Sequence, residues 1–136
     1  MSSTGTRQAL NVLGTALVPC SYDPLTGWFR DGCCHTDEHD QGRHVICVRV
    51  TVAFLNQQME IGNDLITPRP EYRFKGLKPG DRWCVCALRW REAYEAGHAA
   101  PVVLDSTHAK ALDYVPLAWL KARAWTPEQP GGPEPV

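Results

Sequence analysis

The sequence predicts an α+β fold, in which helices are packed on one face of a small mixed sheet to form a two-layer sandwich. Two observations support this prediction. Short runs of apolar and β-branched residues alternate along the chain with segments that carry helix start and stop signals. The 136 residues are 43% apolar and 21% charged, which is typical of one globular domain.

The predicted domain spans residues 10–124. Residues 1–9 are small and polar, and residues 125–136 are rich in proline and glycine, so we expect both ends to be disordered. Residues 11–43 contain repeated turn signals, which make the N-terminal part of the domain loop-rich.

The first strand and the first helix are predicted directly after this loop-rich part. Residues 44–50, HVICVRV, are apolar and β-branched, which favours a strand. Thr51 can cap a helix that runs to about Ile61, and Gly62 would end it. One face of that helix would carry Phe54, Leu55, Gln58 and Met59.

Two more strands and a helix are predicted after an irregular, proline-containing stretch at 63–81. Residues 82–88 alternate as a strand, and residues 89–96 form a helix that Gly97 ends. Residues 101–105 are expected to form a short strand.

Two helices are predicted to complete the domain. Ser106 or Thr107 would cap a helix over 108–115, and Pro116 would open a last helix that runs to about Ala124. The free N–H groups of a first helical turn could also hold an anion, but a plain capping role for Thr107 is the default interpretation.

The charge of the chain argues against dedicated nucleic-acid or membrane-surface binding. Lys and Arg number 14 against 15 Asp and Glu, and no apolar run is long enough to span a membrane. Residues 69–91 mix basic and aromatic side chains, which favours a small anionic ligand held by Arg82 and Arg89 over a nucleic acid. The N-terminus has no apolar signal-peptide core, so we expect a cytoplasmic protein whose six cysteines do not by default form three disulfides.

The cysteine-containing segments carry the candidate chemistry. In a strand, Cys84 and Cys86 point to the same side and could present two thiols to one space, with core packing as the competing interpretation. In the pair Cys33-Cys34 the side chains point oppositely, and we expect Cys34 to face inward. By residue type, a zinc site could be assembled from Cys34, His44, Cys47, Cys84 and Cys86.

The evidence for that zinc site is limited by spacing, because the chain contains no CxxC motif. His35 and His39 lie among carboxylates and are interpreted as parts of a solvated loop. Thiol catalysis is a second interpretation, since cationic neighbours such as Arg82 favour a reactive thiolate and a histidine could act as its base. The candidates for this role are Cys34, Cys84 and Cys86 as thiols, with His44 or His108 as the base.

Several longer strings occur together in the chain: NVLG (11–14), PLTGWFRDGCC (24–34), GNDL and TPRP (within 62–70), GLKPGDRWCVCALRW (76–90) and PVVLDSTHAKAL (101–112). Through them the sequence resembles a family of small, mostly bacterial proteins known only as a conserved domain of unknown function, from residue 11 to about 124. The resemblance implies a small α+β two-layer domain and implies no activity. The positions that match the recurrent polar pattern of the family are Cys20, Arg30, Cys34, Asp40, His44, Cys47, Asn63, Asp64, Asp81, Arg82, Cys84, Cys86, Arg89 and His108. Lys75 and Ala100 depart from the pattern, which tends to have proline there.

Together these observations predict a small cytosolic protein with a Cys/His/Asp-lined pocket, formed by residues 30–47, residues 82–88 and the turn at Asn63-Asp64. The pocket would bind a small ligand or a metal, or carry out thiol redox chemistry. The residues expected to contact a ligand are Arg30, Asp40, Asn63, Asp64, Arg82, Arg89 and His108. The alternative is a non-enzymatic structural or accessory protein whose cysteines are core residues.

Overall fold

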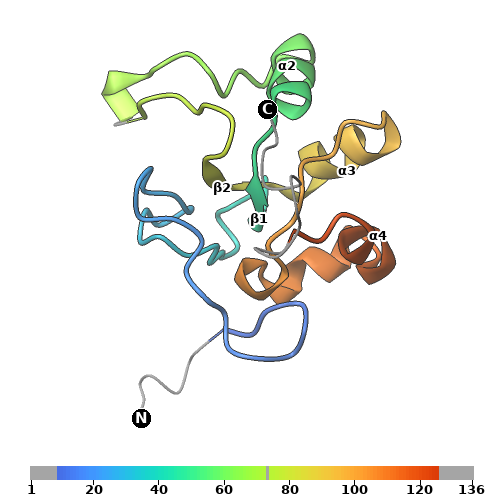
Figure 1. The fold of residues 1–136 in the computed structure, drawn as a ribbon. Coiled ribbons are helices and arrows are strands. Elements are labelled where there is room, and N and C mark those ends of the chain that lie inside the picture. Colours follow the sequence, from blue (N-terminus) through green and yellow to red (C-terminus); the bar gives the residue numbers. More distant parts are fainter. Residues whose placement is uncertain (1–8, 73, 126–136) are drawn as a thin grey trace.

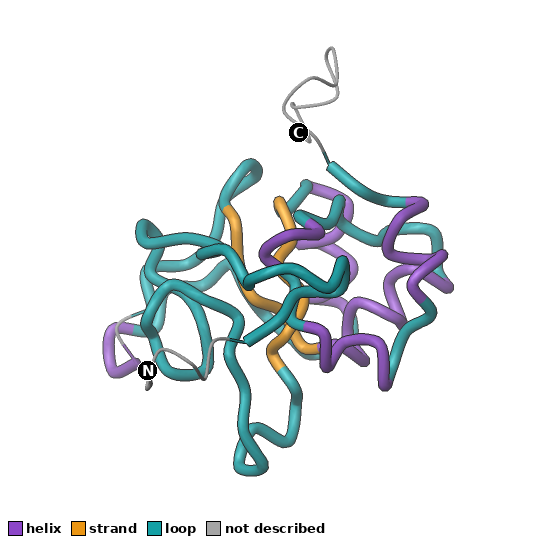
Figure 2. The backbone as a smooth tube through the Cα atoms, turned by 90° about the horizontal axis from the view of Figure 1, so that it is seen from below, coloured by secondary structure: helices purple, strands orange, loops and turns teal. Residues whose placement is uncertain are grey.

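The computed structural model describes residues 9–72 and 74–125. Within them, two antiparallel strands, β1 (His44–Arg49) and β2 (Arg82–Cys86), form a small sheet near the centre of the domain (Figure 1). Helices α3 (Ala87–Glu95) and α4 (Leu117–Ala122) lie on one side of the strands, and long loops lie on the other (Figure 2). The predicted α+β class is therefore confirmed. The ends expected to be disordered fall almost entirely outside the described residues.

The predicted mixed sheet is wrong, because the two strands are antiparallel and the expected third strand at 101–105 is absent from the described chain. Val102 makes only isolated bridges, antiparallel to Val48 and parallel to Ala124. The short helix η2 (Leu104–Ser106) then begins at once, so the chain has no room to extend this pairing into a strand.

Helix α2 (Val52–Glu60) forms for the local reasons that its sequence suggests. The Thr51 hydroxyl accepts a hydrogen bond from the Phe54 N–H at 3.0 Å, which satisfies one of the free donors of the first turn. Gly62 has a φ of 90°, a left-handed conformation that suits glycine and stops the helix. Of the four residues expected on one face, Phe54, Leu55 and Gln58 are buried, whereas Met59 is 42% exposed.

The helices after β2 begin at other residues than predicted. Helix α3 starts at Ala87, two residues early, and Gly97 follows its end with a φ of 84°. The predicted cap at Ser106 or Thr107 is wrong: the short helix η3 (Ala109–Asp113) is capped by His108.

The His108 side chain accepts a hydrogen bond from the Lys110 N–H at 2.9 Å, which is the capping contact of η3. Pro116 directly precedes α4, as expected. A further short helix, η1 (Pro70–Tyr72), lies in the irregular stretch between α2 and β2. None of the helices in the described residues is long and apolar enough to cross a membrane.

The buried side chains form two separate clusters on the two strands. The larger is a conventional apolar core that includes Val48, Phe54, Val85 and Trp90. The smaller contains Cys20, Cys34, Cys47, Cys84 and Val103, with Trp125 packed against it. The alternation of a strand separates the clusters, because Trp83 and Val85 point into the large core while Cys84 between them joins the small one.

Candidate functional site

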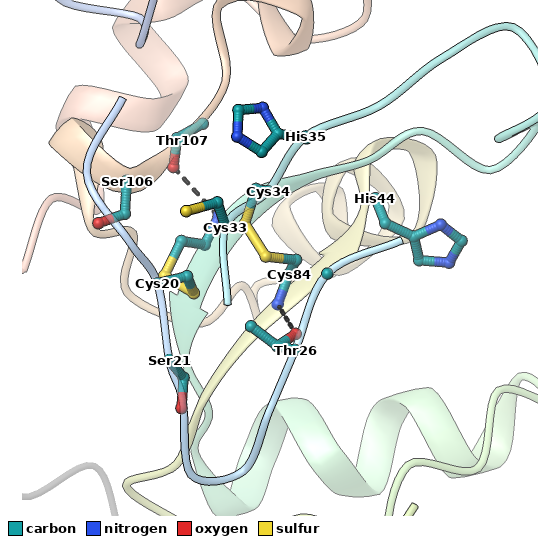
Figure 3. The surroundings of a disulfide bond; sticks show 12 residues. Cys20, Ser21, Thr26, Cys33, Cys34, His35, His44, Cys84, Ser106 and Thr107 are labelled. Atoms are coloured by element: carbon teal, nitrogen blue, oxygen red, sulfur yellow. Dashed lines mark hydrogen bonds between the residues drawn. A yellow bond between two sulfur atoms is a disulfide. The ribbon is translucent and has the colours of Figure 1, made fainter. Parts of the chain in front are cut away.

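Four of the six cysteines form two disulfides in the small cluster. Cys20 is bonded to Cys47, and Cys34 is bonded to Cys84, with Cα–Cα distances of 5.8 and 5.4 Å (Figure 3). The expectation of reduced thiols is therefore wrong for these four residues. We based that expectation on the reducing conditions of the cytoplasm. The fold places the four sulfur atoms close enough to bond, and the sequence alone does not show this.

The four cysteines come from four different segments, and the sheet register brings them together. Cys47 on β1 lies directly opposite Cys84 on β2, so their side chains share one face of the sheet. Two loops from the N-terminal part deliver Cys20 and Cys34 to that face. Each of the four residues is at most 4% exposed, and Cys34 and Cys47 are fully buried. The two disulfides thus attach the loop-rich part of the chain to the sheet.

Cys33 and Cys86 are the two cysteines that remain as free thiols, and both are partly buried. Burial, followed by the nearby charge of Asp31, raises the pKa of the Cys33 thiol, which keeps it protonated and makes it a poor nucleophile. Cys86 lies opposite His44 rather than in the disulfide cluster. The expectation that Cys84 and Cys86 serve one site is therefore not met, while Cys34 faces inward as predicted.

Asp40 and His44 form a second polar arrangement, away from the sulfur atoms. Asp40 is fully buried, and its Oδ1 atom lies 2.7 Å from Nδ1 of His44. Its Oδ2 atom accepts hydrogen bonds from the Thr36 hydroxyl at 3.0 Å and from the His44 N–H at 2.9 Å. These contacts fix the carboxylate, and the carboxylate in turn fixes the orientation of the imidazole ring. The ring points away from the disulfides in Figure 3.

His44 lies at the edge of a pocket of about 420 Å³. Its ring stacks on that of Trp28, with centroids 6.0 Å apart and an angle of 12° between the planes. Arg30 reaches the same pocket, with its guanidinium carbon 5.2 Å from the centre of the Trp83 ring. The residues that line the pocket are Gly27, Trp28, Arg30, His44, Asp64, Leu65, Arg69, Tyr72, Phe74, Trp83 and Cys84.

This pocket joins the three segments that the sequence analysis placed around a site. Arg30 and His44 come from the 30–47 segment, Cys84 comes from β2, and Asp64 comes from the turn after α2. The Asp64 carboxylate also accepts hydrogen bonds from two N–H groups of its own turn, so it has an architectural role as well. Asn63 lies outside the pocket lining and donates to the Gln58 side chain at 2.7 Å.

The remaining candidates do not line this pocket. Arg82 lies over the Trp125 ring at 5.0 Å, whereas Arg89 pairs with Glu92 at 3.5 Å, so the two arginines have different partners. His108 is the helix cap described above. Burial lowers the pKa of His108, and the positive charges of His35, Lys110 and Arg43 add to this effect in that order. His108 therefore favours the neutral form.

Three of the residues that build these sites were not among the candidates. Trp28, Phe74 and Trp83 are aromatic walls of the pocket; Phe74 and Trp83 lie in the basic and aromatic stretch at 69–91, but nothing local indicates that Trp28 joins them. Cys20 appeared only through the family resemblance. A local signal that could have suggested Trp28 is the string GWFR at 27–30, in which two aromatic residues directly precede an arginine.

The comparison with protein families matches residues 10–124 to the family described as an uncharacterized protein conserved in bacteria, DUF2237. The chain belongs to this family. The match covers the whole predicted domain and confirms the resemblance seen in the sequence. No curated protein matches the chain. The DUF2237 description carries no activity, so the proposals below rest on the geometry of this chain.

Proposed function

We propose that this DUF2237 protein binds a small ligand in the pocket beside His44, and that His44 exchanges a proton with that ligand. The observation that carries the proposal is the contact between His44 Nδ1 and the buried Asp40 carboxylate. A carboxylate can only accept a hydrogen bond, so Nδ1 carries the hydrogen and Nε2 is left as the basic nitrogen. A ring held in this way is a suitable general base or acid.

The pocket chemistry favours a planar ligand with a negatively charged group. Trp28, Phe74 and Trp83 offer aromatic surfaces on which a flat molecule could stack. Arg30 supplies positive charge: among the described residues it has no carboxylate partner, and its contacts are the Gly27 carbonyl and the Trp83 ring. The other pocket cation, Arg69, pairs with Glu71 at 3.7 Å.

The backbone at Arg30 supports the same interpretation. Its φ is 56°, in the left-handed region that costs a non-glycine residue about 1–2 kcal/mol. Strained backbone of this kind is concentrated at functional sites, where the surrounding structure holds it in place. Here the residue is exposed, and its guanidinium lies over the Trp83 ring at the pocket.

Thiol redox catalysis is a weaker candidate than ligand binding. Cys34 is fully buried and Cys84 is 2% exposed, so an attacking thiol has little access to their disulfide. The two disulfides fit better with the structural role that the sequence left open as the alternative. A cytoplasmic location stays a prediction, and it would require these buried disulfides to resist reduction or to exist also in a reduced form.

Binding can be tested with benzoate, the simplest aromatic carboxylate, added to the ¹⁵N-labelled full chain. Benzoate should shift the indole N–H signals of Trp28 and Trp83, and the variant Arg30→Gln should weaken binding by about tenfold, the size of one lost charge-assisted contact. Arg123→Gln, which removes a cation away from the pocket, should leave binding unchanged. Equal affinity in the Arg30 and Arg123 variants would refute the assigned role of Arg30.

The orientation of His44 can be tested without any ligand. Long-range nitrogen–proton correlation spectra show which ring nitrogen carries the hydrogen. The wild-type protein should show hydrogen on Nδ1, and Asp40→Asn should disturb this preference because an amide can also donate. A neutral ring with hydrogen on Nε2 only in the wild-type protein would contradict the proposed proton exchange.

A further inference from the structure

The four buried cysteines support a second inference, whose observations are separate from those on His44 and Arg30, although Cys84 also lines the ligand pocket. We propose that, once both disulfides are reduced, the same four side chains bind one Zn²⁺ ion as thiolates. The oxidised protein would then be held together by two disulfides and the reduced protein by a metal. The four ligands are Cys20, Cys34, Cys47 and Cys84.

The positions of the sulfur atoms support this metal site. Sulfur atoms from both disulfides, those of Cys20, Cys34 and Cys47, all lie within 4.8 Å of one another. A tetrahedral zinc ion with Zn–S distances of about 2.3 Å needs sulfurs that are about 3.8 Å apart. The Cys84 sulfur is outside this group of three, but it is bonded to Cys34 and its residue lies opposite Cys47 in the sheet, so it would complete the set by moving once the disulfide is broken.

The surroundings of the cluster suit a closed, four-coordinate site. All four cysteines are at most 4% exposed, and their apolar neighbour is Val103, so water has little access to a fifth position. Soft thiolate donors select zinc over calcium or magnesium. The four ligands come from two strands and two loops, which gives the metal the same cross-linking role as the disulfides.

Trp125 supplies the second observation that points to a charged group in this cluster. It packs against the cysteines, and its buried Nε1–H has no hydrogen-bond partner among the described residues. An unsatisfied buried donor is rare and calls for an acceptor, and a zinc-bound thiolate sulfur would be one. The guanidinium carbons of Arg49 and Arg82 lie over the Trp125 ring at 5.2 and 5.0 Å. Positive charge near the cluster would offset part of the double negative charge of a zinc ion with four thiolates.

The conversion of the disulfide form into the zinc form balances with a dithiol as the reductant. Each protein disulfide takes two electrons and two protons from one dithiol, which itself becomes a disulfide, and two dithiols therefore yield four protein thiols. Zn²⁺ binding then displaces the four thiol protons. In the reverse direction, two disulfide oxidants accept the four electrons, the Cys20–Cys47 and Cys34–Cys84 bonds form again, and zinc leaves.

The test uses the full chain, reduced without oxygen by a phosphine, and then titrated with Co²⁺ as a spectroscopic substitute for Zn²⁺. We expect the intense charge-transfer and visible bands of tetrahedral cobalt bound to thiolates, saturating at one metal per chain. Zn²⁺ should remove these bands, and oxidised protein should show none. The variant with both Cys33→Ser and Cys86→Ser, which keeps the four proposed ligands, should give the same spectrum.

Cys20→Ser should weaken cobalt binding by at least about tenfold, because even the loss of an outer-sphere partner costs about 10–100-fold. If the reduced protein unfolds without metal, recovery of its circular dichroism on metal addition supports the site. Failure of metal to bind or to restore the fold would overturn the proposal. So would a folded, reduced protein without thiolate bands, or loss of the bands in the Cys33 and Cys86 variant.

Discussion

The stability of the oxidised domain should depend strongly on each disulfide. The Cys20–Cys47 bond closes a loop with a sequence separation of 27, and the Cys34–Cys84 bond closes one of 50. In the chain-entropy description these loops correspond to about 3.6 and about 4.1 kcal/mol of stabilisation at 25 °C. Each value is a large share of the roughly 5–15 kcal/mol that holds a typical domain folded.

Urea unfolding at neutral pH, followed by tryptophan fluorescence, measures this contribution. With a slope of about 1.5 kcal/mol/M, replacing either pair by alanines should lower the midpoint by roughly 2.5 M. The matched control replaces Cys33 and Cys86 by alanine, which removes two thiols and no cross-link. The two closed loops overlap, so the effects of losing both disulfides need not add.

A midpoint shift below roughly 0.5 M for either disulfide variant, or a control that shifts as much as they do, would refute a stabilising role for the cross-links. A small shift would mean that the apolar core alone holds the loops on the sheet. A large shift in the control would mean that packing of the thiols matters more than the cross-links.

Three further predictions concern local structure. Thr51→Ala should lower the free energy of unfolding by about 1 kcal/mol, measured by urea denaturation, because it removes the cap of α2. Gly76→Ala should cost at least about 2 kcal/mol in the same assay, because φ is 82° and the added Cβ would overlap the Ile66 carbonyl oxygen. Burial holds the pKa of His108 below its ordinary value, so the unfolded chain binds more protons and stability should fall as the pH drops below about 6.5. His108→Asn keeps an acceptor for the Lys110 N–H and should flatten the dependence of melting temperature on pH over that range, whereas an unchanged slope would assign the acid sensitivity to other groups.

Helix α2 was predictable because its signals are local. Thr51 and Gly62 act on backbone groups within four residues of themselves, and no distant contact overrides them. The prediction of a strand at 101–105 was wrong because a strand depends on distant partners rather than on local signals. Its residues have the right composition, but only Val102 finds partners, and strand formation depends on those distant partners rather than on propensity.

The candidate site was predictable in its segments but not in its pairings. Asp40 and His44 are four residues apart and could be chosen by residue type, yet their contact depends on a turn in which Arg43 adopts a φ of 51°. The partners of Cys34 and Cys47 lie 50 and 27 residues away, and local spacing contains no information on which cysteine is paired with which. The expectation of reduced thiols came from the compartment and could not foresee that the fold places four cysteines on one sheet face.

Cys84 connects the two sites, because it lines the ligand pocket and also belongs to the buried cysteine cluster. Its N–H donates to the Thr26 hydroxyl at 2.9 Å, which links β2 to the loop that carries the pocket residues Gly27 and Trp28. If reduction of the disulfide moves this residue, benzoate should bind the oxidised and reduced proteins with different affinities.

The difference in benzoate affinity must equal the effect of benzoate on the reduction equilibrium of the disulfide. A ligand that prefers the oxidised protein by a given factor must make reduction of the disulfide less favourable by the same factor, because coupling between two equilibria is reciprocal. Benzoate dissociation constants for the two forms give one ratio, and the fractions of reduced chain in a dithiol buffer with and without saturating benzoate give the other. We expect the two ratios to agree and to differ from one. Equal dissociation constants would show that the pocket wall keeps its shape when the Cys34–Cys84 bond is broken, and that the two sites work independently.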